Sequence, residues 1–207
     1  MSHDGQQALL EPLLSTGYAE HADAIVPEML RLFRGDNRRV MRQTENGRYG
    51  VLHSGCITHQ DLVRHLEQSI TVARYLLDEN GRCSTVCLDI DIPKAEIPGS
   101  ASERAAKKRS EYLHAVRDTA THLYGTYGLS ENAILVEDTG DRGYHVGLFF
   151  EEPQPGGDVV VFGDDIRLSV DLESLEVFPP TATHGPTGFS KSLVRLPPEI
   201  RPKRGTD

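Results

Sequence analysis

The sequence has little cysteine, no long apolar run and no net positive charge, and each shortage argues against a class of protein. Its three cysteines, Cys56, Cys83 and Cys87, contain no C-x-x-C pair, which argues against a disulfide framework and a structural zinc site. No apolar run approaches the roughly 18 residues that cross a bilayer, so we expect no membrane partner. The first residues lack the features of a signal peptide, so we expect a cytoplasmic protein.

The formal net charge of −9 counts against a nucleic-acid partner, because phosphates attract Lys and Arg. The average hides two basic stretches, residues 31–48 with six arginines and residues 104–109 with two lysines and two arginines. A solvated surface is the simpler interpretation of the second stretch. The first stretch contains turn residues, so it leaves weak, salt-dependent binding of nucleic acid or nucleotide phosphates open.

Hydrophobic periodicity and turn signals predict an α+β fold, in which strands are interrupted by single helices. The predicted helices are 1–34, a helix that starts at Thr58 with the capping box "THQD", and 102–124 with Ser102 as its N-cap. The predicted strands are 38–43, 48–53, 71–77, 83–92, 132–138, 143–152, 158–163, 165–171 and 192–196. We expect a turn at Asn46-Gly47 and pairing of 71–77 with 83–92 across "DENG".

Two aspartates lie inside the predicted strand "CLDIDIP". Alternation along a strand places Asp89 and Asp91 on one face and Leu88, Ile90 and Ile92 on the other. Because two neighbouring carboxylates repel each other, the pattern predicts a bound cation.

A histidine on another predicted strand and a carboxylate further along the chain are also candidates. His145 follows "TGDRGY", which brings backbone amides, Gly143 and Arg142 close to the imidazole, an arrangement suited to phosphate oxygens. Glu176, before Val177, is a candidate to complete a carboxylate cluster around a divalent metal. The alternatives are a satisfied core histidine and a surface glutamate at a strand end.

These segments together resemble the archaeo-eukaryotic primase superfamily, and within it the CRISPR-associated and conflict-system primase-polymerases. The resemblance covers about residues 30–198 and rests on "LDIDIP", "GDRGYHVGLFFEEP", "LEVFPP" and "GPTGFSKSLVRLPPEI", with "LFRGDNRRVMRQ" upstream. Pro180-Thr181, "KSLV" and Gly147 depart from the family's usual residues, which affects the expected hold on nucleotide or template.

The resemblance implies one catalytic domain over residues 1–198, with a helical part at about 1–35 and a basic tail at 199–207. In it, an N-terminal α/β module packs against an RRM-like antiparallel sheet, with the active site in the cleft between them. Asp89, Asp91 and Glu176, with Asp171 as a rival to Glu176, would hold two Mg²⁺ or Mn²⁺ ions. The implied nucleotide contacts are Gly143, Arg142, His145, Lys191, Arg195, Arg34 and Arg42, with Arg38 beside them.

The implied activity is template-directed nucleotidyl transfer with NTPs or dNTPs on single-stranded or primed DNA, or on RNA, within a larger complex or beside fused domains. Two alternatives stay open. One is a metal-dependent nuclease, which would use the same carboxylates with a water-positioning group. The other is a catalytically degenerate nucleic-acid-binding or assembly module of a defence or repair complex.

Overall fold

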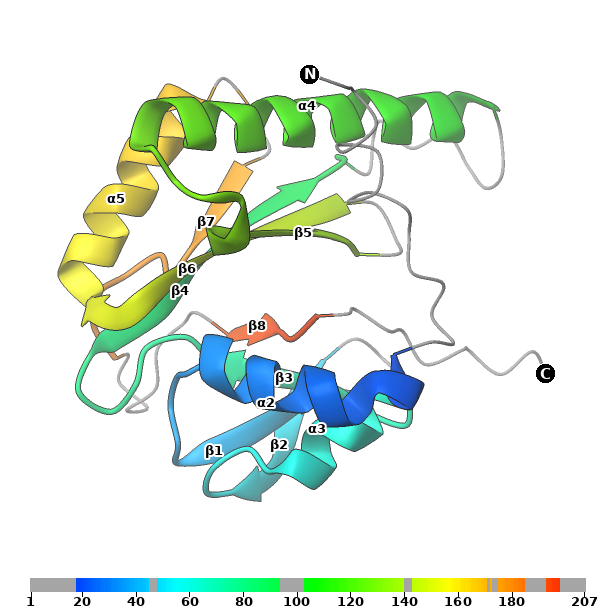
Figure 1. The fold of residues 1–207 in the computed structure, drawn as a ribbon, viewed down its shortest axis with the longest axis vertical. Helices are drawn as coiled ribbons and strands as arrows, with labels where there is room; N and C mark the ends of the chain where they lie inside the picture. The colour runs from blue at the N-terminus through cyan, green and yellow to red at the C-terminus, as the bar shows by residue number, and fades with distance from the viewer. Residues whose placement is uncertain are drawn as a thin grey trace.

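The described residues form two antiparallel four-stranded sheets with helices, which confirms the α+β class (Figure 1). The computed structural model describes residues 18–44, 48–93, 103–139, 143–170, 172, 175–184 and 193–197. The first sheet has the order β2-β1-β3-β8, from β1 (Arg39–Gln43), β2 (Tyr49–Ser54), β3 (Thr71–Tyr75) and β8 (Leu193–Arg195). The second sheet has the order β5-β6-β4-β7, from β4 (Arg82–Asp91), β5 (Ile134–Asp138), β6 (Gly143–Pro155) and β7 (Leu175–Phe178).

Each sheet packs against its own helices. The helices are η1 (Ala19–His21), α2 (Ala22–Leu32), α3 (His59–Leu66), α4 (Glu103–Tyr127), η3 (Glu131–Ala133) and α5 (Gly156–Ser169). One apolar core lies between α2, α3 and the first sheet, and the other lies between α4, α5 and the second sheet. In Figure 1, α4 runs along the side of the second sheet that faces away from β8. None of the helices in the described ranges combines the length and apolar character needed to cross a membrane.

Several local predictions are confirmed. β1 and β2 pair antiparallel, and α3 begins after Thr58 with the predicted capping box. β8 forms where 192–196 was predicted, and it pairs with β3 although it is far from it in sequence. Asn46-Gly47, Ser102, most of the predicted first helix and the tail 199–207 lie outside the described residues.

The predicted pairing of 71–77 with 83–92 is wrong, although both strands exist. Only one isolated bridge joins them, between Leu77 and Cys83, and beyond it the two strands enter different sheets. The tight turn does form, because the Asp78 carboxylate accepts hydrogen bonds from the backbone N–H groups of Asn80 and Arg82, each at 2.8 Å. β4 pairs with β6 on one edge and with β7 on the other, so neither edge is open to β3.

The predicted strands 158–163 and 165–171 are also wrong, because this stretch forms α5. Its buried residues include Val159, Gly163 and Ile166, which follow helical spacing, whereas Val161 is 70% exposed and Leu168 is 83% exposed. A Cβ at Gly163 would lie 2.6 Å from Cγ1 of Val177, so the glycine permits close packing of the helix on β7. Tertiary packing therefore outweighs the β-propensity of the valine run.

The start of α3 yields a pH-dependent prediction about stability. The Asp61 Oδ2 atom accepts hydrogen bonds from the Thr58 N–H at 2.8 Å and from the Thr58 hydroxyl at 2.6 Å, and it lies 2.9 Å from Nε2 of His53. Burial raises the pKa of Asp61, but the bonds from Thr58 and His53 outweigh it and bring the pKa below 3.8. The hydrogen bond to Asp61 raises the pKa of His53 above 6.5.

Asp61→Asn is expected to lower the free energy of unfolding by about 1 kcal/mol near neutral pH. The charged pair contributes above the unfolded Asp pKa of 3.8 and fades as the pH rises through the raised His53 pKa. The loss should therefore be larger at about pH 5.5 than at about pH 8.5. Urea denaturation at both values measures it, with Asp23→Asn in the first turn of α2 as control. Equal losses at both pH values would contradict the role of the pair.

Candidate functional site

Four polar side chains form a row across the second sheet, one from each strand. In the strand registers, Glu137 of β5 is opposite His145 of β6, His145 is opposite Asp89 of β4, and Asp89 is opposite Glu176 of β7. Directly opposite residues project from the same face of a sheet, so all four share one face. Asp91 lies two residues further along β4 on that face. The fold thus brings together four residues predicted from the sequence, Asp89, Asp91, His145 and Glu176.

His145 is the buried centre of this row. Its Nδ1 atom lies 3.2 Å from Oε2 of Glu137, and its Nε2 atom lies 3.7 Å from Oδ1 of Asp89. An ionised carboxylate only accepts hydrogen bonds, so Nδ1 donates to Glu137, which fixes the ring with Nε2 toward Asp89. Sequence reasoning missed Glu137. Glu137 lies two residues after Leu135 on a predicted strand, so alternation places both on one face. The neighbouring sequence did not indicate that Glu137 lies opposite His145.

Asp89 holds a carboxylate in an unfavourable environment. Its Oδ1 atom is buried and has no hydrogen-bond partner among the described residues. Burial is the main cause that raises the Asp89 pKa, and the charges of Asp91 and Glu176 raise it further, whereas His145 and Arg195 lower it. A buried acceptor that lacks a donor and is surrounded by like charges would be relieved by a cation.

The donor chemistry of the row fits Mg²⁺ or Mn²⁺, because hard divalent cations prefer carboxylate oxygens. The Oδ1 of Asp89, which accepts no hydrogen bond from a described residue, also fits such a ligand role. Within the described ranges, no three His, Cys, Asp or Glu side chains are already grouped as ligands of one ion. The assignment of Asp89, Asp91 and Glu176 as metal ligands therefore stays a prediction, and its rival Asp171 lies outside the described residues.

Gly143 at the start of β6 leaves space for Asp91, its partner across the strand pair. A Cβ at position 143 would lie 2.5 Å from Oδ1 of Asp91 and 2.7 Å from the Ile90 carbonyl oxygen. Neither contact is possible without movement, and the carbonyl belongs to the backbone of a central strand. The glycine is therefore needed for the close approach of β6 to the carboxylate, whereas Arg142 beside it lies outside the described residues.

Gly143→Ala is expected to lower the free energy of unfolding by about 1 to 3 kcal/mol, because the new methyl group overlaps Asp91 and Ile90. Gly157→Ala in α5 is the matched control, since a Cβ there meets nothing within 4 Å. That control should be neutral or slightly stabilising. Urea denaturation of both variants measures the difference, and equal stabilities would show that β6 can shift away from β4 without cost.

A small cavity lies against the row, between the two sheets. Glu137 and His145 line it from the second sheet, Val194 and Arg195 from the region of β8, and Phe33 from the end of α2. Its volume of about 20 Å³ holds about one water molecule, so a nucleotide does not fit inside it. Arg195 lies 3.5 Å from Oε1 of Gln43 through its Nη1, and its charge acts on Asp89.

The other predicted nucleotide contacts lie elsewhere. Arg34 lines a second, larger cavity beside the loop that follows α2. Arg38 forms an ion pair with the buried Asp36, and Arg42 is an exposed residue of β1 opposite Gly50 and Val72. Lys191 lies outside the described residues. Of these contacts, the structure brings His145, Gly143 and Arg195 to the neighbourhood of Asp89.

The comparisons with known proteins show a distant structural likeness. No family model matches the chain, and no curated protein matches it. Among solved structures, the chain is similar to "Polymerase Domain from Mycobacterium tuberculosis Ligase D in complex with DNA", with 15% identity and a TM-score of 0.43, over 76% of this chain and 62% of that one. The chain thus spans less than two thirds of that structure, and a likeness this distant carries no argument about function. Nothing here supports the CRISPR-associated subtype.

Proposed function

We propose that this protein catalyses template-directed nucleotidyl transfer, as a primase, a polymerase or both, with NTPs or dNTPs on single-stranded or primed nucleic acid. The observation that carries the proposal is the buried Oδ1 of Asp89, which has no described hydrogen-bond partner and belongs to a row of three carboxylates and one histidine. The order of the sequence motifs that contribute Asp89, His145 and Glu176 to this row supports it.

Asp89, Asp91 and Glu176 would hold Mg²⁺ or Mn²⁺. When bound, such ions act as Lewis acids that favour deprotonation of a hydroxyl group and offset the charge on phosphate oxygens. Burial, together with the charges of Asp91 and Glu176, raises the Asp89 pKa, and a bound cation would offset both effects by favouring the ionised carboxylate. The carboxylates thus supply negative charge at the place where the reaction needs a cation.

The remaining residues would bind and orient the nucleotide. Glu137 holds the His145 ring through Nδ1. As an imidazolium, His145 would also donate from Nε2 to a phosphate oxygen, and Arg195 would donate from its guanidinium. Because the cavity beside them is too small for a nucleotide, the substrate would reach the row from its solvent-accessible end, where Glu176 is exposed. In the reaction, a 3′-hydroxyl oxygen bonds to the α-phosphorus, its proton leaves, and the bond to pyrophosphate breaks.

The test is incorporation of labelled NTP and dNTP on a single-stranded template, with and without a primer, in Mg²⁺ and in Mn²⁺. Template-dependent products that disappear in Asp89→Ala would support the proposal, and products without a primer would identify priming. Degradation of the template without nucleotide would favour a metal-dependent nuclease. Template binding without either reaction would favour a binding or assembly module.

A further inference from the structure

A second cavity, of about 260 Å³, lies at the far end of β4 from Asp89. The loop after α2 lines it with Arg34 and Asn37, and β3 lines it with Arg74. The remaining polar lining residues lie near the start of β4 and are Asp78, Arg82 and Ser84. Ser84 and Asp89 are five residues apart, which is about 17 Å along a strand. An occupant of this cavity is therefore separate from a group that reacts at Asp89.

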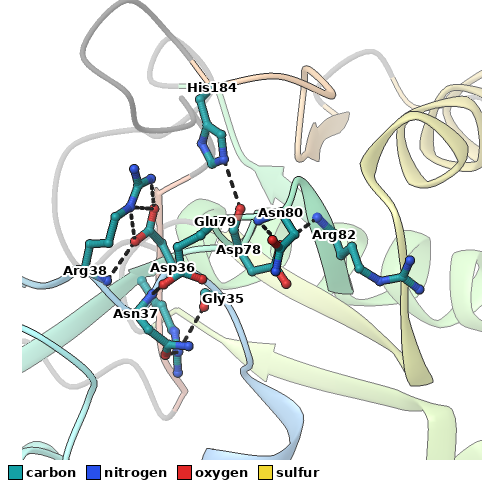
Figure 2. Close-up of polar contacts among 10 residues, drawn as sticks. Gly35, Asp36, Asn37, Arg38, Asp78, Glu79, Asn80, Arg82 and His184 are labelled. Carbon is teal, nitrogen blue, oxygen red and sulfur yellow. Dashed lines mark hydrogen bonds and ion pairs between the residues drawn. The ribbon is translucent and has the colours of Figure 1, made fainter.

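The wall of the cavity is fixed by contacts between the loop after α2 and the turn before β4 (Figure 2). The Asn37 N–H donates to Oε1 of Glu79 at 2.7 Å, and the Asp36 N–H donates to the Tyr75 carbonyl oxygen at 3.1 Å. A Cβ at Gly35 would lie 2.1 Å from that same carbonyl oxygen, so the loop passes as close as a glycine allows. The cavity is thus preformed by backbone contacts.

The charged side chains that line this cavity are mainly basic. Among the described residues that line it, Arg34, Arg74 and Arg82 are basic and Asp78 alone is acidic. The Asp78 Oδ1 atom accepts from the backbone of its own turn, as Figure 2 shows. None of the three arginines forms an ion pair with a described residue, whereas Arg31 and Arg38 nearby each have a carboxylate partner.

Arg74 gives the strongest support for an anion-binding role of this cavity. It is 6% exposed, and among the described residues its guanidinium donates only to neutral oxygens, at Phe33, Gly35 and Asn37. Its Nε atom is buried and has no hydrogen-bond partner among the described residues. A buried guanidinium with neutral partners and an unused donor is costly, because burial of a charge is normally offset by an opposite charge.

We infer that the cavity lined by Arg34, Arg74 and Arg82 binds a phosphate group, carried by a nucleotide or by a nucleic-acid strand. Guanidinium groups suit phosphate because they present several donors in one plane. The cavity is about thirteen times larger than the one beside His145, from 260 Å³ against 20 Å³. This inference does not rest on the proposed activity, since none of its residues belongs to the Asp89 row.

The first test is a titration of the ¹⁵N-labelled protein with inorganic phosphate, with EDTA present, observed at the arginine Nε–H resonances. Phosphate is expected to shift the resonances of Arg34, Arg74 and Arg82, and to leave that of Arg31 in place. Chloride at equal ionic strength corrects for screening. Shifts that are the same in chloride and phosphate would overturn the inference.

The source of the phosphate is then identified with two probes in EDTA, ATP and a labelled single-stranded oligonucleotide. Whichever probe binds in this cavity, ATP or the oligonucleotide, is expected to bind Arg34→Ala about tenfold more weakly than wild type. Arg34 is exposed and has no described partner, so this variant should fold. Arg31→Ala, three residues earlier and also exposed, is the matched control. If Arg34→Ala and Arg31→Ala bind both probes as tightly as wild type, the cavity is not a phosphate site.

The two hypotheses fail separately in this design. Asp89→Ala should lose nucleotide incorporation and keep phosphate binding at the arginines. In Arg34→Ala, Mg²⁺ should still shift the resonances of the Asp89 row, and Mn²⁺ should still broaden them. A variant that loses activity and keeps phosphate binding thus tests the catalytic row. A variant that loses phosphate binding and keeps metal binding tests the arginine cavity.

Discussion

Replacement of Asp89 by alanine is expected to reduce nucleotide incorporation about a thousandfold or more, because metal-assisted charge stabilisation contributes several kcal/mol to such reactions. Asp89 is the centre of the proposed ligand set, opposite Glu176 and two residues from Asp91. Primer extension under single-turnover conditions measures the loss. Asp118→Ala, an exposed aspartate on α4, is the control and should extend primers at the wild-type rate.

Asp89→Ala should not lower the free energy of unfolding of the metal-free protein. Burial, with Asp91 and Glu176, raises the folded-state pKa of Asp89 above 3.8. The folded protein therefore holds this proton more tightly than the unfolded chain, so its stability falls as the pH rises through the interval between the two pKa values. Asp89→Asn, which removes the charge at similar volume, should match or exceed the stability of wild type near neutral pH, and its advantage should disappear in acid.

Metal binding gives a readout that does not depend on activity. Mn²⁺ should raise the melting temperature of wild type, because a ligand that binds only the folded state stabilises it. It should raise that of Asp89→Asn much less. An Asp89→Ala protein that extends primers normally would refute the proposed site. A variant that loses both activity and stability in EDTA would instead assign Asp89 a structural role.

The sequence predicted those parts of the fold and site that depend on neighbours along the chain. Alternation placed Asp89 and Asp91 on one face of β4 and Leu88 and Ile90 on the other, and burial in the structure follows that pattern. The capping box at Thr58 is a contact over three residues, so its signal is complete within "THQD". Both features were readable because their physical causes lie within one strand or one helical turn.

Long-range pairing could not be read in the same way. The turn "DENG" formed as expected, but it does not determine whether the flanking strands stay together, and β6 and β7 occupy both edges of β4. Glu137 was not predicted as a site residue for the same reason, since its role depends on its position opposite His145. The pairing of strands is decided by the whole sheet, so the residues next to Glu137 in the sequence do not indicate its cross-strand partner.

The basic stretch 31–48 shows a further limit of composition. Arg31 and Arg38 are neutralised by Glu28 and Asp36, whereas Arg34 lines the cavity beside Arg74. Arg74 lies outside the stretch and was not singled out, yet it is the buried cation there. Three-dimensional pairing therefore decides which arginines of a cluster are available to a phosphate.

His145→Ala is expected to lower kcat/KM for the nucleotide about a hundredfold, mainly through a higher KM, because His145 is proposed to bind a phosphate oxygen. Steady-state extension with varied nucleotide separates the two constants. His114→Ala, an exposed histidine of α4, should leave both unchanged. The variant should also be less stable than wild type, by about 1 to 3 kcal/mol, because the partly buried Glu137 loses a hydrogen-bond donor.

Variants of Glu137 separate two effects on nucleotide binding, the orientation of the His145 ring and the presence of that ring. Glu137→Gln retains an oxygen that can accept from Nδ1 of His145, so it should lose less kcat/KM than His145→Ala, and Glu137→Ala should lose more than Glu137→Gln. In the His145→Ala background, either Glu137 change should have little further effect on KM, because there is no ring left to orient. Additive effects in the double variants would mean that Glu137 acts independently of His145. An unchanged KM in His145→Ala, together with its loss of stability, would mean that the contacts of His145 with Glu137 and Asp89 maintain the sheet and that His145 does not bind the nucleotide.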